Sequence, residues 1–313
     1  MTEFIVRPDV RAFLAMMAAH PRPAFTAEFL ASIRNLKMTP DMSADKPVGE
    51  LGEIRDVVMP GPGGDIALRL FDPRAERGAG PVVIFYHGGG FAAGSIDSHA
   101  GLAAEIARTL DLPVVSVEYR LAPENPWPAA PDDGEAAARW IAENGSAFGR
   151  DFTGLVLCGD SAGGNLAIVT ALALRDAAAV LPVILQVAIY PAVDHSRDYP
   201  SRSAFASGYG LDAADMVLFD QHYAADKNHV RNSPLLADQQ GMPPTLVVTG
   251  ELDPLRDEGR AYAAATALAG VQTIFHEAAG TIHGFAGYRR AIPSAQADVD
   301  AFLGLAKAML SAR

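Results

Sequence analysis

Residues 155–164, LVLCGDSAGG, join an apolar run to a glycine-rich turn around one serine, and NLAIVTALALRDAAA after them has the pattern of a helix. Ser161 therefore lies on a turn between a strand and a helix, within the pattern G-x-S-x-G. Such a turn is sharp, and side chains two places before or after the serine would collide with the neighbouring strand and helix. Gly159 and Gly163 avoid this collision, so the hydroxyl of Ser161 is exposed beside the positive end of the helix. The alternative interpretation is a turn that only closes a strand against a helix.

Eight segments rich in β-branched or aromatic residues are predicted as strands: RDVVM (55–59), DIALRLF (65–71), VVIFY (82–86), PVVSVEY (113–119), LVLC (155–158), VILQVAI (183–189), TLVVTG (245–250) and QTIFHE (272–277). Only PGPGG separates the first two, as in a hairpin, whereas the later, more continuously apolar segments alternate with helical stretches. This pattern predicts an α/β protein with a mostly parallel sheet, an antiparallel edge and helices on both faces.

Two regions depart from the alternation of strands and helices. Residues 1–50 look helical and then loose, and they end in TPDMSADKP (39–47), which is typical of a linker. Residues 195–231 contain a long polar loop and one helical pattern, which is too long for a plain connection and favours a lid or cap. No internal repeat is present.

The composition limits the classes of protein to which the chain can belong. Its 313 residues are 50% hydrophobic, enough for a large core, and 37 acidic against 25 basic residues give a formal charge of −12. This charge repels nucleic acid and anionic membrane surfaces, so a small or neutral partner is expected. The only cysteine, Cys158, lies in an apolar run and is expected to be a small buried hydrophobe, without a disulfide or a cysteine-based metal site.

The segment AFLAMMAA (12–19) imitates the apolar core of a signal peptide. Acidic residues offset the basic ones before it, and Val10, Leu14 and Met17 recur at helical spacing, which favours an amphipathic surface helix. No apolar run approaches the roughly 20 residues that span a bilayer. We therefore expect a cytoplasmic, soluble protein without a membrane span.

A serine hydroxyl is a weak nucleophile near neutral pH and needs a base. His283 follows the last predicted strand in a short loop, AAGTIHGF, where its side chain can face Ser161 across the carboxyl edge of the sheet. The other seven histidines lie in the presumed cap, in loops or within a strand pattern. A solvated surface histidine is the alternative interpretation of His283.

The base needs a carboxylate to hold its tautomer, and the chain order serine, acid, histidine places that acid between the other two. TLVVTGELDPLRDEG supplies Asp253 just after a strand. Asp253 precedes a proline, so it could instead only cap a helix that begins with Pro254. Asp257 and Glu251 are rival carboxylates.

Three glycines in YHGGGF (86–91) follow the strand VVIFY and leave backbone N–H groups free to approach a substrate closely. Gly88 and Gly89 are predicted to donate to a developing oxyanion, with the N–H of Ala162 as a third donor. His87 is expected to hold this loop, because no metal-binding spacing of histidines or cysteines accompanies it. The glycines also lack the spacing of a dinucleotide or phosphate loop.

The chain resembles the hormone-sensitive-lipase-like family of α/β-hydrolase esterases, also called bacterial family IV. The motifs that carry the resemblance extend over roughly residues 86–285 in the family's order: YHGGGF (86–91), YRLAPENPWPAAPDDG (119–134), GDSAGGNLA (159–167), NSPLLA (232–237), GELDPLRDEG (250–259) and HGF (283–285). The GDSAG form points to one subgroup of that family. The first fifty residues match none of these motifs.

The resemblance implies an eight-stranded α/β-hydrolase core and a catalytic triad of Ser161, Asp253 and His283. It also implies a catalytic domain over residues 51–313, with a cap built from residues 1–50 and an insert at about 195–231. The implied function is a serine carboxylesterase that works through an acyl-enzyme on Ser161, without a metal or another cofactor. The 8% aromatic content and the modest cap favour small esters with short to medium acyl chains. A homodimer is the oligomer considered.

The residues expected to line the substrate site are apolar or aromatic: Phe91, Phe205, Tyr209, Leu211 and Phe285. The apolar stripe of Val10, Leu14 and Met17 could also cover the substrate site, but such stripes more often serve only for packing, which is the competing explanation. A binding module similar to the plant gibberellin receptors would keep the glycine loop but lose the histidine. A hydrolase of amides or of long-chain lipids would use the same groups and stays an alternative.

Overall fold

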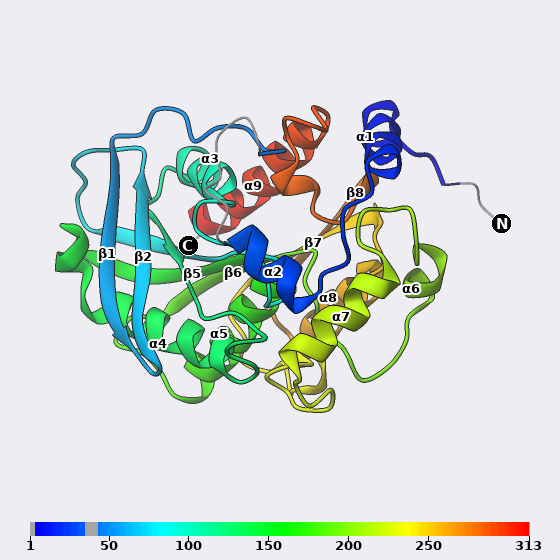
Figure 1. The fold of residues 1–313 in the computed structure, drawn as a ribbon. Coiled ribbons are helices and arrows are strands. Elements are labelled where there is room, and N and C mark those ends of the chain that lie inside the picture. Colours follow the sequence, from blue (N-terminus) through cyan, green and yellow to red (C-terminus); the bar gives the residue numbers. More distant parts are fainter. Residues whose placement is uncertain (1–3, 35–42, 313) are drawn as a thin grey trace.

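The computed structural model describes residues 4–34 and 43–312. All eight predicted strands are present, and they form one sheet in the order β1-β2-β4-β3-β5-β6-β7-β8 (Figure 1). The strands are β1 (Glu53–Gly61), β2 (Gly64–Asp72), β3 (Gly80–Tyr86), β4 (Val114–Val117), β5 (Phe152–Asp160), β6 (Val183–Ile189), β7 (Thr245–Leu252) and β8 (Thr273–Ile282). The helices are α1 (Pro8–Ala19), α2 (Ala27–Arg34), α3 (Ala100–Leu110), α4 (Ala129–Glu143), α5 (Ala162–Asp176), α6 (Pro200–Ala204), α7 (Ala213–Tyr223), α8 (Arg256–Leu268) and α9 (Ala295–Ser311), with short 3₁₀ turns η2 (Gly145–Phe148), η3 (Pro234–Leu236) and η4 (Phe285–Gly287).

The sheet is parallel except at one edge, as the sequence predicts. The hairpin of β1 and β2 closes where Gly61 pairs with Gly64, and β2 runs antiparallel to β4. Every other neighbouring pair is parallel. Parallel strands place their carboxyl ends at one edge of the sheet, so the turns after β3, β5, β7 and β8 lie on the same side.

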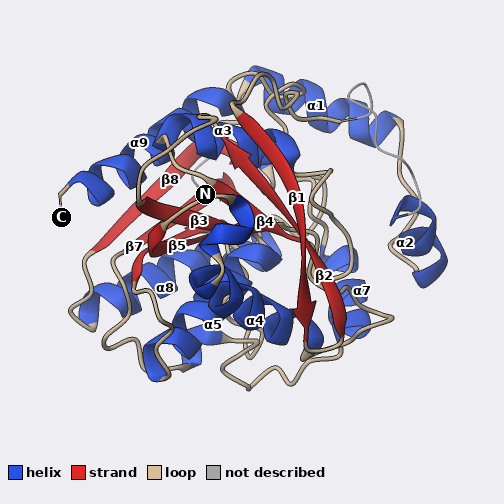
Figure 2. Ribbon diagram, turned by 90° about the vertical axis from the view of Figure 1, so that its left-hand side faces the viewer, coloured by secondary structure: helices blue, strands red, loops and turns tan. Residues whose placement is uncertain are grey.

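Helices cover both faces of the sheet (Figure 2), with α3 and α9 on one face and α4, α5 and α8 on the other. The central strands are therefore buried on both faces, which explains their nearly continuous apolar sequences. Cys158 belongs to this core as predicted, and burial raises the pKa of its thiol. Among the described residues, no helix combines the length and the apolar composition needed to cross a lipid bilayer.

Two segments far apart in the sequence pack together beside the carboxyl edge of the sheet. The ring of Phe25, between α1 and α2, lies 4.7 Å from that of Phe219 on α7, and His222 Nε2 lies 2.8 Å from the carbonyl oxygen of Phe25. Arg22 forms an ion pair with Asp215 at the start of α7. The segment between β6 and β7 contains two helices, α6 and α7, rather than the single helical pattern expected. We call residues 4–34 and 195–231 the cap segments.

The N-terminal cap segment is also tied to the C-terminal part of the chain. Arg7 donates to both carboxylate oxygens of Asp298 on α9, at 2.6 and 2.8 Å. Residues 39–42 of the expected linker lie outside the described residues, but Asp45 from its second half is buried and accepts two hydrogen bonds from the fully buried Arg289. The second half is therefore fixed rather than loose, because a partner 244 residues away holds it.

The last strand is longer than the sequence predicts. QTIFHE was expected to end the strand at residue 277, whereas β8 continues to Ile282 because it keeps pairing with β7 beyond a register shift between Gly250 and Leu252. The loop AAGTIHGF is thus mostly strand. Leu252 on β7 pairs with Ile282 on β8. Asp253 follows Leu252 and His283 follows Ile282, so the two residues lie side by side.

The turn after β5 shows why glycines surround Ser161. The backbone of Ser161 has φ 55° and ψ −117°, a conformation that residues other than glycine rarely adopt. A Cβ atom on Gly163 would lie 1.9 Å from the carbonyl oxygen of Tyr86 on β3, and one on Gly159 would lie 2.2 Å from the carbonyl oxygen of Gly163. Both collisions are with backbone atoms, so the strand and the helix can approach this closely only with glycine at these positions.

We expect Gly163→Ala to destabilise the protein by at least the ~1–3 kcal/mol typical of overpacking, because backbone atoms cannot move aside. Gly304 is a matched control, since it lies in α9 and a Cβ there would have no neighbour within 4 Å. Gly304→Ala should stabilise the protein slightly, because alanine favours a helix over glycine by roughly 0.5–1 kcal/mol. Urea unfolding of both variants measures the difference, and equal stabilities would contradict it.

Candidate active site

The hydroxyl of Ser161 begins a chain of hydrogen bonds at the carboxyl edge of the sheet. Its Oγ lies 2.9 Å from Nε2 of His283, and Nδ1 of the same imidazole lies 2.7 Å from Oδ2 of Asp253. The three residues follow β5, β8 and β7 respectively. The structure therefore brings together the serine, histidine and acid that the sequence motifs single out.

The carboxylate of Asp253 is fully buried and uses its two oxygens differently. Oδ1 accepts the N–H of Leu255 at 2.7 Å, which stabilises the turn before α8, while Oδ2 faces His283. The helix begins at Arg256. Asp253 and Pro254 therefore precede the cap position, and the alternative of a simple helix cap does not describe this side chain.

Electrostatics favour a protonated imidazole next to Asp253. Burial alone would lower the pKa of His283, but the charge of Asp253 and its hydrogen bond outweigh burial, and the pKa is raised above its ordinary value. The aspartate thus holds the Nδ1 proton in place and leaves Nε2 to accept the proton of Ser161. A group arranged in this way can act as a general base toward the serine.

The two rival carboxylates point elsewhere. Oε2 of Glu251 accepts the N–H of Gly280 at 2.7 Å. Asp257, the second residue of α8, accepts the N–H of Ser201 at 2.9 Å and pairs with Arg256 at 2.8 Å. Neither carboxylate has His283 as a hydrogen-bond partner.

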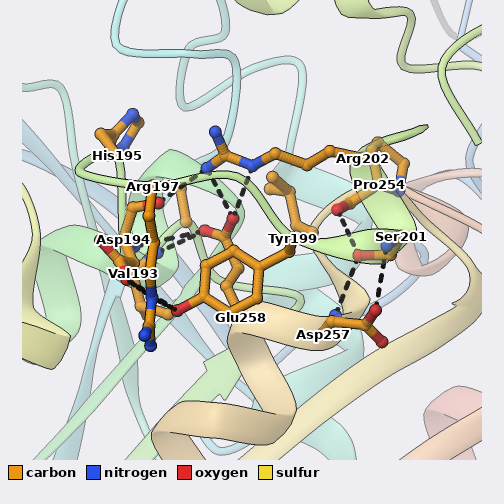
Figure 3. Close-up of polar contacts among 12 residues, drawn as sticks. Val193, Asp194, His195, Arg197, Tyr199, Ser201, Arg202, Pro254, Asp257 and Glu258 are labelled. Atoms are coloured by element: carbon orange, nitrogen blue, oxygen red, sulfur yellow. Dashed lines mark hydrogen bonds and ion pairs between the residues drawn. The ribbon is translucent and has the colours of Figure 1, made fainter.

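A polar cluster holds the start of the second cap segment against α8 (Figure 3). The buried carboxylate of Glu258 accepts the N–H of Val193 at 2.8 Å and pairs with Arg202 on α6 at 2.7 Å. The same guanidinium donates to the carbonyl oxygen of Asp194 at 2.7 Å. These contacts order the chain where it leaves β6.

Ser201 extends this cluster to the turn that carries Asp253. Its hydroxyl donates to the carbonyl oxygen of Pro254 at 2.8 Å and accepts the N–H of Asp257 at 3.2 Å, as Figure 3 shows. Helix α6 is thereby pinned to the β7–α8 turn. The position of the Asp253 carboxylate consequently depends on the second cap segment as well as on the sheet.

The glycine loop after β3 lies beside Ser161, but its first N–H is already in use. Gly88 donates to Oδ1 of Asp160 at 2.8 Å, which corrects the expectation that this N–H is free for an oxyanion. Within the described part of the chain, the N–H groups of Gly89 and Gly90 have no hydrogen-bond partner. The first N–H of α5, that of Ala162, has no preceding helical turn to which it could donate.

His87 holds this loop from inside, as expected. Its ring stacks on that of Tyr119 with centroids 4.3 Å apart, and the hydroxyl of Tyr119 donates to the carbonyl oxygen of His87 at 2.6 Å. Burial lowers the pKa of His87 to about 3, so the ring is neutral at neutral pH. A neutral, fully enclosed ring supports the loop without contributing charge.

A pocket of about 450 Å³ opens onto Ser161 and His283. Of the five residues predicted to line it, only Leu211 does so. Phe91 instead stacks on Tyr223 with centroids 3.8 Å apart, and Phe205 and Phe285 are fully buried in the core. Tyr209 packs on Phe205. These residues were expected at the pocket because they are aromatic, but their rings pack against neighbouring elements instead of facing the pocket.

The cap segments and the core supply the other apolar walls of the pocket: Met17, Phe25, Phe219 and Tyr288. Helical spacing had placed Met17 in the expected cap, and Phe219 lies within the insert expected at about 195–231. Phe25 lies in a proline-containing connection and Tyr288 in a short turn, where no periodic pattern marks an inward-facing side chain. Only three-dimensional contacts identify them.

The comparisons with known proteins agree with this geometry. A family model described as the alpha/beta hydrolase fold matches residues 83–287. Carboxylesterase NlhH of Mycobacterium tuberculosis is 34% identical over 317 residues, covering 94% of this chain and 95% of the relative. Ethyl acetate hydrolase of Pseudomonas putida is 39% identical over 229 residues, covering 71% of this chain and 72% of the relative.

A solved structure is similar over almost the whole chain. An ester hydrolase from the metagenome of Lake Arreo superimposes with a TM-score of 0.91 at 38% identity, covering 98% of this chain and 100% of that one. The eight-stranded sheet, the family match and the esterase relatives together identify the protein class. The chain belongs to the α/β-hydrolase fold family, and within it to the hormone-sensitive-lipase-like carboxylic ester hydrolases.

Proposed function

We propose that this carboxylic ester hydrolase works through a catalytic triad of Ser161, His283 and Asp253. The observation that carries the proposal is the unbroken chain of hydrogen bonds, at 2.9 and 2.7 Å, that opens onto the pocket. His283 removes the proton of Ser161 as its oxygen attacks the ester carbonyl, and Asp253 stabilises the imidazolium. The alcohol leaves with that proton, and a water activated by His283 then hydrolyses the acyl-enzyme.

The negative charge of the tetrahedral intermediate needs donors that nothing else occupies. The N–H groups of Gly89 and Gly90 and the first N–H of α5, at Ala162, meet this requirement. Each such donor is worth about 3 kcal/mol of transition-state stabilisation. Gly88 takes part indirectly, because its bond to Asp160 fixes the loop.

The substrate class we propose is a small ester with a short to medium acyl chain. A pocket of about 450 Å³ lies in the lower half of the range of roughly 300–1,000 Å³ usual for small-molecule sites. Its apolar walls suit an aliphatic chain, and one relative is an ethyl acetate hydrolase. A binding module without catalysis is disfavoured because the base is present and hydrogen-bonded to the serine.

The finer assignments extend this proposal. GDSAG at residues 159–163 supports membership of the subgroup named for that motif. We divide the chain into a cap, made of residues 1–50 and 195–231, and a catalytic domain over the rest of 51–313. A cytoplasmic location is supported by α1, whose Val10 and Phe13 are buried against the body of the protein. A homodimer is the oligomer to test by light scattering.

The nucleophile is tested by covalent labelling. A fluorophosphonate should modify Ser161 in the wild type, and Ser161→Ala should lose both the label and activity toward p-nitrophenyl butyrate by several orders of magnitude, because members of a triad act as a unit. Mass spectrometry of the labelled peptide identifies the site. Activity retained in Ser161→Ala would overturn the proposed mechanism.

The acid is tested by two matched substitutions, at Asp253 in the β7–α8 turn and at Asp257 in the first turn of α8. Asp253→Asn keeps an oxygen for the N–H of Leu255, so the melting temperature should change little while turnover falls roughly 10³–10⁴-fold. Asp257→Asn weakens the contacts to Ser201 and Arg256, so it should lower the melting temperature and leave turnover near wild type. The reverse pattern would assign the acid to Asp257.

The pH profile adds a test of the same pair. Because Asp253 raises the pKa of His283, the base becomes neutral, and kcat/KM rises, above the ordinary histidine pKa of about 6.5. In Asp253→Asn this acid limb should move to lower pH. An acid limb that stays in place would show that Asp253 does not act on His283.

The acyl-chain limit is tested at Phe219, which lies directly over the glycine loop and lines the pocket. Phe219→Ala should raise the ratio of kcat/KM for the octanoate ester over the butyrate ester by roughly tenfold or more, because a single methylene in an apolar pocket is already worth about tenfold and the ring is larger. Phe275→Ala, on the exposed side of β8, is the control and should leave the ratio unchanged. An unchanged ratio in Phe219→Ala would remove this side chain from the acyl site.

A further inference from the structure

Asp160 precedes the nucleophilic serine and is 5% exposed, and its carboxylate takes no direct part in the reaction. Its Oδ1 accepts the N–H of Gly88 at 2.8 Å, and its Oδ2 lies 3.5 Å from the hydroxyl of Tyr190. A Cβ on Gly88 would lie 2.5 Å from Oδ2, so this glycine is needed for the carboxylate to reach the loop. An ionised carboxylate buried in this way is costly unless a cation compensates it.

His99 is the group that faces this carboxylate. Its Nε2 lies 3.6 Å from Oδ1 of Asp160, and its Nδ1 lies 2.8 Å from Oγ of Ser98. Ser98 Oγ accepts the N–H of Ser95 and directs its own proton to the carbonyl oxygen of Ser95, at 3.0 Å. Nδ1 of His99 therefore donates to Ser98. A second proton, on Nε2, would face the carboxylate of Asp160 with a positive charge. This arrangement fits an imidazolium.

Of the titratable groups around His99, Asp160 has the largest effect on its pKa. The neutral ring of His87 lies 5.4 Å away between centroids, Glu118 accepts the N–H of Ile96, and Asp45 is paired with Arg289. Burial would lower the pKa of His99, but the nearby charge of Asp160 outweighs burial and raises it. Burial raises the pKa of Asp160, and His99 outweighs that effect and lowers it.

We propose that His99 is a positioning residue for ester hydrolysis, which as an imidazolium keeps Asp160 ionised so that Asp160 holds Gly88 and aligns the donors of Gly89 and Gly90. The inference rests on the proposed oxyanion role of this loop. His99 lines the inner wall of the pocket beside Ser161. It acts on the reaction through Asp160 and the loop rather than by contact with the reacting atoms.

The positive charge also protects the base. Asp160 is among the groups that raise the pKa of His283. An uncompensated Asp160 carboxylate would raise that pKa further and leave less neutral imidazole to accept the serine proton. The pair of Asp160 and His99 can thus anchor the loop with a charged hydrogen bond without placing a net negative charge beside the base.

The wild type provides the first test. When His99 loses its proton at alkaline pH, the carboxylate loses its partner, so kcat/KM for p-nitrophenyl butyrate should decline with rising pH while circular dichroism shows a folded protein. KM should stay nearly constant, because oxyanion contacts form only in the transition state. A profile that stays flat up to about pH 10, near the ordinary pKa of tyrosine, would overturn the proposal.

His99→Gln removes the charge and keeps a hydrogen-bonding side chain. At pH 7 its kcat should fall about tenfold or more, less than the roughly 10²–10³-fold loss expected for deleting a whole donor. The ratio of wild-type to variant activity should shrink toward one as the pH rises, because the wild type then loses the same charge. His276→Gln, on β8 away from the pocket, is the control and should match the wild type. A ratio that is constant with pH would indicate a merely structural role.

A double-mutant cycle separates the pair from a general loss of folding. Asp160→Asn keeps an acceptor for Gly88 and removes the charge that needs His99, so His99→Gln should have little further effect in that background. If His99→Gln alone fails to fold, the double variant should fold, because removing both charges is tolerated better than removing one. An equal loss in both backgrounds would refute the coupling. Activity retained in Ser161→Ala would refute the proposed function instead.

Discussion

The close approach of the first turn of α5 to the end of β3 is the constraint on which the site depends. It exists because positions 159 and 163 carry no Cβ, and because the backbone of Ser161 has φ 55° on the turn from β5 to α5. As a result the start of the helix, the glycine loop after β3 and Asp160 share one small volume. A larger side chain at Gly159 or Gly163 would therefore push Ser161 away from the glycine loop.

The acid and the base depend on a different kind of contact. The pairing of Leu252 with Ile282 sets Asp253 and His283 side by side, and the polar cluster around Glu258 and Ser201 fixes the turn of Asp253 from the cap side. The proposed triad is thus assembled by backbone pairing on one side and by buried polar contacts on the other. The cap therefore supports the chemistry as well as covering the pocket.

The sequence predicts those features that local physics determines. Apolar runs gave all eight strands, and the glycines around Ser161 gave the turn, because both depend on neighbours in the chain. His283 and Asp253 followed from their positions after strands. The role of Gly88 could not be predicted, since it depends on the carboxylate of Asp160, 72 residues away.

The pocket residues were predicted poorly for a related reason. Phe91, Phe205 and Phe285 have the same apolar character as Phe25 and Phe219, and only tertiary packing decides which rings are enclosed in the core and which face the pocket. The expected linker was predicted poorly for the same reason, because the ion pair of Asp45 with the distant Arg289 fixes its second half. Composition alone cannot distinguish a loose polar segment from one that is held by a distant partner.

The N-terminal cap segment has a consequence for the order of biosynthesis. Residues 4–25 of this segment contact Asp215, Phe219 and Asp298, all of which leave the ribosome long after Arg7, Arg22 and Phe25. Until these partners have been synthesised, residues 4–25 therefore lack the contacts that hold them in the folded protein. The last of these partners, Asp298, follows β8 in the chain, so the contact that ties Arg7 to α9 forms only after all eight strands have been synthesised.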